Sequence, residues 1–529
     1  MKKNHFSYIL LIALFIASGC TGLLDVKPND RYTPETFWDS EKKAMAGLTA
    51  CYDVLTANGI YGYATPLWEE TATPNAYNYD NSAGFNLIAL GTHSATNAGT
   101  GNIVSGIIAL RWENCYAGIG RCNELLANID NVPQMNEDLK NRMKAEAKFL
   151  RGFFYSLLAT YYGGAPLILT KPNLETDGKL PRNSREEVVA QVIKDLDEAA
   201  GALPPKYTGN DIGRATKGAA LALKARVLLF EASPLNNPAN NVAKWSAAAA
   251  AAKAVIDMAG TAGYGLFPNY RQLFMPANEN KQETVFDVQY TISQTGYGSS
   301  FDLINRQYNT NAPLRGMVEG YLMKDGLPAS QSPSFDPTNI HLNRDPRMYQ
   351  TLVYPGDTYI GAVTTPTSPF KQTGYGVKKY SIYDKEPNSN LINQAGRSEI
   401  NYMVIRYADV LLMYAEAQNE AVGPDASVYN AVDTIRKRAG MPVYVTGLTQ
   451  AEMRAAIRQE RRVEFAMEGF YYNDIRRWKT AETVMNGAIY NSQGAAIVTR
   501  TFDAARDYWW PIPHTQRELN PNLEQNPNY

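Results

Sequence analysis

The chain has 529 residues, of which 45% are hydrophobic, and its 51 lysines and arginines nearly balance 52 acidic residues. This length allows a sizeable core, built either as one repeat-based body or as two lobes. The near-zero net charge supplies no long-range field that attracts nucleic acid or an anionic surface, which argues against nucleic acid as a partner.

The first 20 residues have the layout of a bacterial lipoprotein signal peptide. Lys2 and Lys3 precede an apolar run from Phe6 to Ala17, and Ser18-Gly19-Cys20 follows. The run is shorter than the roughly 20 residues that a membrane-spanning helix needs. We therefore expect residues 1–19 to be removed, Cys20 to carry the lipid, and the remaining body, residues 20–529, to lie outside the cytoplasm on a membrane anchor.

Helical periodicity dominates residues 20–266. Ser184 and Glu187 form the pattern of a capping box at the start of an amphipathic helix. A second helix is expected between Gly213 and Pro234, and the alanine run 247–252 predicts a third, with small side chains that let neighbouring helices approach. The architecture expected is a stack of tetratricopeptide-like helical hairpins, although the 34-residue consensus of that repeat is not visible.

The second part, residues 267–529, begins with a change of pattern. Residues 267–398 are rich in Gly, Pro, Asn and Tyr, with short β-like runs such as 284–288 between turn residues. Helices are expected again over residues 402–422, 428–438 and 450–479. The predicted fold class is therefore all-α, a helical hairpin stack with a loop-rich, partly irregular layer that carries short strands.

Cysteine and histidine provide no metal site. Cys51, Cys115 and Cys122 are an odd set, and two cysteines seven residues apart on one helix lie about 10.5 Å apart along its axis, too far for a disulfide. Buried free thiols are the interpretation we favour. The four histidines fall in no His-x-x-x-His spacing, so neither a metal nor a cofactor is predicted.

A series of motifs, taken together in their order and spacing along the chain, resembles the SusD/RagB family of outer-membrane nutrient-binding lipoproteins. The stretches that carry this resemblance are Leu24–Pro28, Phe37-Trp38, Ala147–Tyr155, Tyr162–Leu167, Gly213–Thr216, Asp325–Pro328, Asn343–Arg347, Ile405–Ala417, Glu460–Phe465, Asp474–Trp478, Pro511–Pro513 and Asn520–Tyr529. At Gly163-Gly164 the family often carries Gly-Asp, a departure to which we attach no function.

The resemblance implies a surface-exposed, lipid-anchored protein of the outer membrane. Such a protein captures polysaccharide or oligosaccharide and delivers it to a partner TonB-dependent transporter of the SusC type, without catalysis. Two alternatives stay open. A peptide-capturing member of the same family is one, because helical hairpin stacks also present peptide grooves. A lipid-anchored glycoside hydrolase is the other.

Three glutamates at helical spacing provide the pattern that favours the hydrolase. Glu460, Glu464 and Glu468 are four residues apart, and glycosidases use paired carboxylates. Residues on successive turns of one helix rarely form such a pair, however, and like charges there repel. We interpret the three glutamates as part of a structural ion-pair network. The nearest partners in the sequence are Arg461 or Arg462, Arg476 and Arg477.

Two further motifs are also interpreted as structural. Arg344-Asp345-Pro346-Arg347 has the form of a turn in which the aspartate accepts hydrogen bonds from the backbone, rather than of an anion clamp. Trp509-Trp510, ahead of Pro511, is expected to pin a terminal segment to the core.

The predicted binding site is aromatic, because a sugar ring presents an apolar face for stacking and a rim of hydroxyls for hydrogen bonds. Tyrosine, at 34 residues, is twice as frequent as phenylalanine, at 17. The resemblance points to an early loop, here residues 61–80, and to loops past mid-chain, here residues 290–308. The residues proposed to bind glycan are Trp68, Asn75, Tyr77, Tyr79, Tyr297 and Arg306.

Overall fold

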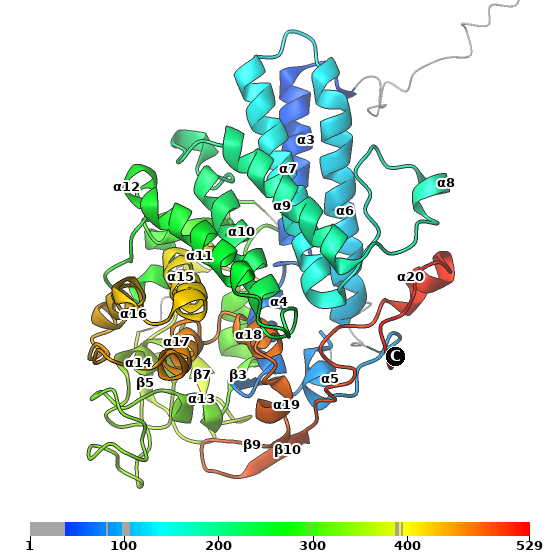
Figure 1. The fold of residues 1–529 in the computed structure, drawn as a ribbon. Coiled ribbons are helices and arrows are strands. Elements are labelled where there is room, and N and C mark those ends of the chain that lie inside the picture. Colours follow the sequence, from blue (N-terminus) through cyan, green and yellow to red (C-terminus); the bar gives the residue numbers. More distant parts are fainter. Residues whose placement is uncertain (1–36, 81–82, 98–105, 295, 387–390, 393–394) are drawn as a thin grey trace, which may run out of the picture.

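The computed structural model of the chain describes residues 37–80, 83–97, 106–294, 296–386, 391–392 and 395–529 (Figure 1). The predicted signal peptide and Cys20 lie outside these residues, so their cleavage and lipidation stay predictions.

Long helices form the main body of the molecule (Figure 1). They are α3 (Glu41–Asp53), α6 (Gly106–Asn128), α7 (Glu137–Tyr162), α9 (Arg185–Ala202), α10 (Lys217–Ala232), α11 (Val242–Asp257), α15 (Tyr407–Val422), α16 (Ala426–Arg438) and α17 (Gln450–Glu464). From α6 to α11 each long helix packs on the next, and α15 then packs on α11. The expected stack of helical hairpins is confirmed.

Shorter helices connect and flank this stack. They are η1 (Val54–Thr56), α4 (Thr65–Glu69), η2 (Glu70–Ala72), α5 (Phe85–Leu90), η3 (Ile129–Asn131), α8 (Leu174–Asp177), η4 (Gly209–Asp211), α12 (Ala259–Ala262), η5 (Gln272–Phe274), η6 (Pro276–Asn278), the π-helix η7 (Leu303–Tyr308), α13 (Arg315–Gly320), α14 (Pro346–Thr351), α18 (Tyr471–Arg477), α19 (Ala481–Val484) and α20 (His514–Leu519). None of the helices in the described part of the chain combines the length and apolar composition of a membrane span.

The local signals in the sequence explain the ends of the stack's helices. Ser184 accepts a hydrogen bond from the Glu187 backbone and the Glu187 side chain accepts one from the Ser184 backbone, so the predicted capping box starts α9. Thr216 caps α10 in a similar way through Ala219 N. The alanine run lies in α11, whose small buried side chains allow α10 and α11 to pack closely.

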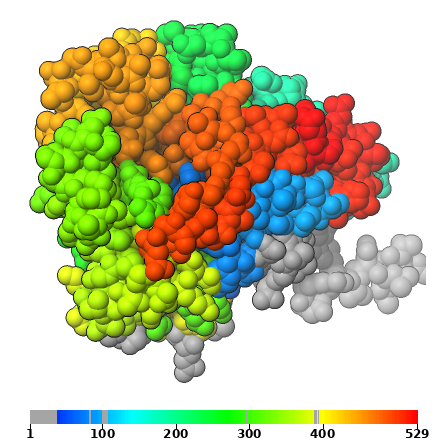
Figure 2. All heavy atoms as spheres, turned by 90° about the horizontal axis from the view of Figure 1, so that it is seen from below, coloured from blue at the N-terminus to red at the C-terminus, as the bar shows by residue number. Residues whose placement is uncertain are grey.

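The loop-rich layer lies under the helical stack and carries short antiparallel strand pairs (Figure 1). The pairs are β1 (Ala76–Tyr77) with β3 (Ala312–Pro313), β2 (Thr284–Val288) with β8 (Tyr402–Arg406), β4 (Leu352–Val353) with β7 (Gly376–Val377), β5 (Thr358–Tyr359) with β6 (Ala362–Val363), and β9 (Gly487–Tyr490) with β10 (Ala496–Arg500). Figure 2 shows the molecule from below, with the β9–β10 hairpin crossing this face between the loop-rich layer and the early segment in blue. The predicted irregular layer and the strand at 284–288 are confirmed.

Two expected helices were placed with the wrong limits. Residues 402–406 form strand β8, not the start of a helix, because Tyr402–Arg406 pairs with β2 and β-branched Val404 and Ile405 suit a strand. The helix begins only at Tyr407.

The helix predicted over 450–479 is interrupted after Glu464 and resumes as α18. Gly469 lies in this break with a φ of +78°, and a Cβ added there would come within 2.4 Å of the Pro66 carbonyl oxygen. The backbone at Gly469 thus approaches the early loop closely, a tertiary contact within the break that periodicity does not reveal.

The expectations for the cysteines and for the tryptophan near the C-terminus are met. Cys51, Cys115 and Cys122 are free and buried. Trp510 is fully buried, donates from Nε1 to the Tyr472 hydroxyl and thereby pins the C-terminal segment, as predicted.

Candidate functional site

The structure brings together the early loop and the mid-chain loop that the sequence proposed as one site. The Tyr79 hydroxyl donates to the Tyr308 carbonyl oxygen at 2.9 Å, and the Tyr290 hydroxyl donates to the Tyr61 carbonyl oxygen at 2.8 Å. Strands β1 and β3 pair antiparallel beside these contacts, with Ala76 opposite Pro313. Residues more than 200 positions apart thus form one continuous wall.

Four tyrosines on this wall form what we call the tyrosine surface: Tyr63, Tyr79, Tyr297 and Tyr308. Tyr79, Tyr297 and Tyr308 are 42%, 49% and 43% exposed, and Tyr63 is half-buried. Aromatic rings that expose one face and keep a polar hydroxyl suit the stacking and hydrogen bonding that a sugar needs.

Arg397 fixes the relative positions of these rings. Its guanidinium lies 5.9 Å from the centre of the Tyr63 ring, and Nη1 donates to the Gly298 carbonyl oxygen at 3.0 Å. Gly298 follows Tyr297 directly, so the arginine joins the two tyrosines. Partial burial, followed by the nearby Tyr308 hydroxyl, raises the pKa of Tyr63, which keeps this hydroxyl protonated and able to donate. The sequence did not single out Arg397, because residues 391–400 around it contain no aromatic side chain.

Two of the six proposed residues are buried and are removed from the exposed site. Trp68 is only 2% exposed, and its Nε1 donates to the Thr310 hydroxyl at 2.9 Å. Asn75 is fully buried, where it donates to Glu70 Oε1 at 2.6 Å and accepts from Arg462 Nε at 2.9 Å. A ring inside the core cannot stack on a glycan, so both residues support the loop from behind.

The other four proposed residues have different degrees of access. Tyr77 is half-buried in β1, whereas Tyr79, Tyr297 and Arg306 are exposed. That these residues bind a ligand stays a prediction. Tyr63 and Tyr308 fall inside the two predicted regions, but composition alone could not rank them above their neighbours.

The three conspicuous glutamates lie in a buried network of ion pairs that we call the Glu464 network. Glu464 receives Arg406 Nη1 at 2.7 Å, Arg347 Nη1 at 2.9 Å and also Arg438. Burial alone would raise the pKa of Glu464, but the three guanidinium groups outweigh burial and hold it far below its usual range.

The two neighbouring glutamates are paired in the same way. Glu468 receives Arg406 Nη2 at 2.8 Å and Lys379 Nζ at 3.0 Å. Glu460 receives Arg436 Nη1 at 3.1 Å and also Arg347. The structural interpretation is confirmed.

The predicted partners of these glutamates were wrong. Arg461 pairs instead with Asp409 and Asp474, and Arg477 pairs with Glu416. The true partners of the network come from other elements. The Arg344–Arg347 motif supplies one of them, since Asp345 caps α14 by accepting from Arg347 N, as the turn interpretation predicted, while the Arg347 side chain reaches the glutamates.

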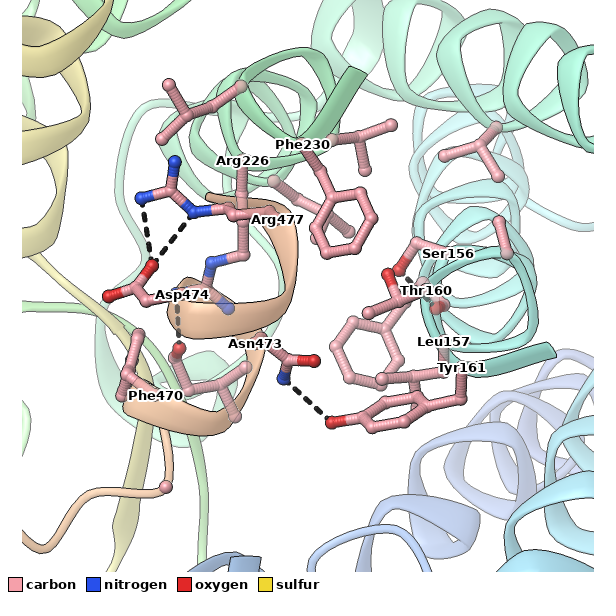
Figure 3. A pocket seen from close by; sticks show the side chains of 18 of the residues that line it. Ser156, Leu157, Thr160, Tyr161, Arg226, Phe230, Phe470, Asn473, Asp474 and Arg477 are labelled. Atoms are coloured by element: carbon pink, nitrogen blue, oxygen red, sulfur yellow. Dashed lines mark hydrogen bonds and ion pairs between the residues drawn. The ribbon is translucent and has the colours of Figure 1, made fainter. Parts of the chain in front are cut away.

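A cavity lies between α7, α9, α10 and α18, and Figure 3 shows its lining. Its polar groups bond one another: Asn473 Nδ2 donates to the Tyr161 hydroxyl at 2.8 Å, and Arg477 Nη2 pairs with Asp474 Oδ1 at 2.8 Å. Its volume is about 130 Å³. Sites for drug-sized ligands span roughly 300–1,000 Å³, so this cavity is too small for an oligosaccharide.

Two protein-family models together match most of the chain, each over a different part. The model described as "SusD family" matches residues 282–529, and the model described as "Starch-binding associating with outer membrane" matches residues 23–229. The SusD-like proteins P25 and P2 of Formosa agariphila are each 26% identical to this chain, over 98% and 100% of its length and 97% and 100% of their own.

Solved structures show a similar fold. A SusD-like carbohydrate-binding protein from Bacteroides fragilis has a TM-score of 0.80 and 28% identity, covering 92% of this chain and 100% of that one. A laminarin-binding SusD-like protein has a TM-score of 0.68 and 24% identity, covering 93% of this chain and 100% of that one. The similarity confirms the predicted tetratricopeptide-like helical fold class.

Proposed function

The chain belongs to the SusD family, and from this membership we propose that it is a carbohydrate-binding protein of the outer membrane that captures polysaccharide or its fragments without catalysis. The family description associates such proteins with the outer membrane. The observation that carries the proposal is the tyrosine surface, where two loops distant in sequence join to expose three rings on one wall.

The mode of binding follows from the chemistry of this surface. Exposed rings can stack on the apolar faces of sugars, while the phenol hydroxyls and neighbouring arginines can bond sugar hydroxyls. An open wall offers each sugar unit few contacts, so affinity for each unit is weak and a long glycan gains by occupying several positions. Weak binding also favours release to a partner transporter of the SusC type, to which we propose that the Cys20-anchored protein delivers its glycan.

The Glu464 network supports a binding role rather than hydrolysis. Glycosidase carboxylates must reach the scissile bond, and one of them must carry a proton near neutral pH. Glu460, Glu464 and Glu468 are each fully buried and ion-paired. The arginines around Glu464 also hold its pKa low, opposite to the shift that a general acid requires.

Native gels containing single glycans test the proposal. The chain from Thr21 to Tyr529 is run through plant, algal, fungal and host polysaccharides, with reducing sugar assayed in parallel. We expect one or more glycans to retard the protein, no reducing ends to be released, and Tyr79→Ala or Tyr308→Ala to abolish retardation. Tyr490→Ala is the matched control, because Tyr490 is 46% exposed but lies on the β9–β10 hairpin.

Each contrary result points to a different alternative. Binding of protein digests but of no glycan would favour the peptide-capturing alternative, and released sugar would overturn the non-catalytic assignment. Delivery is tested separately by purifying the lipidated protein from membranes in mild detergent. A TonB-dependent transporter should copurify, and its absence would contradict the delivery step alone.

A further inference from the structure

A hollow next to the tyrosine surface contains one exposed arginine. The hollow has a volume of about 540 Å³ and opens to solvent between the end of the π-helix η7 and the β5–β6 hairpin. We call it the Arg306 hollow. Its lining includes Arg306, Gln307, Ile360, Val363, Ser368 and Pro369. Tyr308 stands two residues after Arg306, so a ligand stacked on the tyrosine surface lies close to the hollow.

Arg306 is the only charged residue among the described residues that line the hollow. Its side chain is exposed, and the guanidinium is held over the Tyr383 ring at 4.7 Å from the ring centre. In the described part of the chain no carboxylate forms a salt bridge with it. A guanidinium held over a ring is oriented at little entropic cost and keeps N–H groups available for a ligand.

Three buried or half-buried aspartates near the hollow interact with other residues. Asp357 pairs with Lys378 Nζ at 2.6 Å. Asp384 pairs with Arg271 Nε at 3.0 Å. Asp302, one helical turn before Arg306, accepts from the Ser381 hydroxyl at 2.7 Å and from Ile382 N at 2.9 Å. None of these three described carboxylates forms an ion pair or hydrogen bond with Arg306, so its positive charge faces the hollow.

The opposite wall of the hollow is fixed by an unusual hairpin turn. Ile360 has a φ of +50°, a left-handed conformation that β-branched residues rarely adopt. The turn is held because Ile360 N donates to the Asp384 carbonyl oxygen at 2.8 Å and Gly361 N donates to the Lys385 carbonyl oxygen at 2.6 Å. Strained backbone that the surrounding structure holds in place is concentrated at ligand sites. The result here is an apolar rim, with Val363 69% exposed.

We infer that the Arg306 hollow receives a negatively charged sugar unit, a uronate or a sulfate ester, of the glycan that stacks on the tyrosine surface. The inference rests on the proposed function. A planar guanidinium offers paired N–H donors that match the oxygens of a carboxylate or a sulfate group. The Ser368 hydroxyl and the Gln307 amide can bond ring hydroxyls, and Val363 and Pro369 face the C–H side of the sugar.

Pairs of glycans that differ only in charge test this inference. Polygalacturonate is compared with its carboxyl-reduced form, and a sulfated galactan with its desulfated form, in affinity gels and by calorimetry. We expect the mature protein to bind the charged member of at least one pair about tenfold more tightly. Sodium chloride should weaken binding to that member and leave binding to the neutral member unchanged.

Variants of Arg306 assign the preference to the hollow. Arg306→Gln should bind both members of the pair equally. Arg306→Lys, which keeps the charge without the planar fork, should retain an intermediate preference. Arg121→Gln is the control. It removes an exposed arginine of α6 that pairs with Asp53, and the charge preference should remain. A preference within the polygalacturonate pair would identify a carboxylate as the bound group, and a preference within the galactan pair would identify a sulfate ester.

The outcomes separate this inference from the function on which it rests. Equal binding of both members by the unmodified protein, or a charge preference that survives Arg306→Gln, would overturn the inference while glycan binding stands. Loss of all binding in Tyr308→Ala with loss of only the charge preference in Arg306→Gln supports both. Failure of every glycan in the panel to bind would overturn the proposed function and this inference together.

Discussion

The Glu464 network and the tyrosine surface use polar chemistry in opposite ways. In the network every glutamate is buried and pairs with at least two basic side chains, so the charges of these glutamates stabilise the fold. On the tyrosine surface the rings lie half-exposed with few partners. The contrast shows that the residues most conspicuous as catalytic groups in the sequence are structural, whereas the candidate site is made of common tyrosines whose significance lies in their exposure.

Glu464→Gln should have the largest effect, on stability alone. Removing one charge leaves Arg347, Arg406 and Arg438 buried with too few acceptors, and breaking a buried pair costs roughly 3–5 kcal/mol. Urea unfolding should show this loss, while the folded fraction binds glycan normally. The exposed Glu186→Gln should change stability by less than about 0.5 kcal/mol. An unchanged unfolding midpoint in Glu464→Gln would contradict the conclusion that the Glu464 network stabilises the fold.

Acid should next weaken a separate buried ion pair, between Glu416 and Arg477. Burial alone would raise the pKa of Glu416, but mainly Arg477 holds it at about 2, below the ordinary value of 4.5. Because the folded pKa is lowered, the stabilisation is present above pH 4.5 and is lost as the pH falls toward 2. This group accounts for roughly 3 kcal/mol. Unfolding measured from pH 6 to pH 2.5 should show a shallower acid loss in Glu416→Gln, and identical slopes would contradict the assignment.

Tyr297→Ala should affect binding rather than stability. The ring is 49% exposed, so its removal exposes little core, but one stacking position for a sugar is lost. A loss of about 1 kcal/mol corresponds to roughly fivefold weaker binding by calorimetry. Tyr490→Ala again serves as the exposed control. Unchanged binding in Tyr297→Ala would restrict the site to Tyr79 and Tyr308.

Trp68→Phe should have the smallest effect on glycan binding. It removes the hydrogen bond to the Thr310 hydroxyl, a loss of about 1 kcal/mol in stability, and the smaller ring leaves a cavity that adds to this loss. Glycan binding should be unchanged because Trp68 does not reach the surface. Thermal unfolding and affinity gels measure the two effects separately. A selective loss of binding at full stability would return Trp68 to the site.

The elements governed by local rules could be predicted from the sequence. The capping box at Ser184, the alanine-rich α11 and strand β2 depend on residues within a few positions of one another. The limits of α15 and α17 could not, because β8 needs a partner strand more than 100 residues away and the break after Glu464 contains a tertiary contact between Gly469 and the early loop.

The candidate site also has features that the sequence predicts and features that depend on tertiary contacts. The resemblance located both loops, and the structure joins them through Tyr79 and Tyr308. Composition could not show that Trp68 points into the core, because burial depends on Thr310 and on the rings around it. The partners of Glu464 were unpredictable for the same reason, since Arg347, Arg406 and Arg438 come from three different elements.

The joining of distant loops also determines when the binding surface can form during folding. The hydrogen bond from Tyr79 to Tyr308 joins residues 229 positions apart, and Arg397, which fixes Tyr63 beside Tyr297, comes later still in the chain. Contacts of such large sequence separation form slowly, after local helices are made. A chain that has emerged only as far as the end of α11, at Asp257, therefore lacks the tyrosine surface, and any fragment that ends before Arg397 should keep helices but bind no glycan.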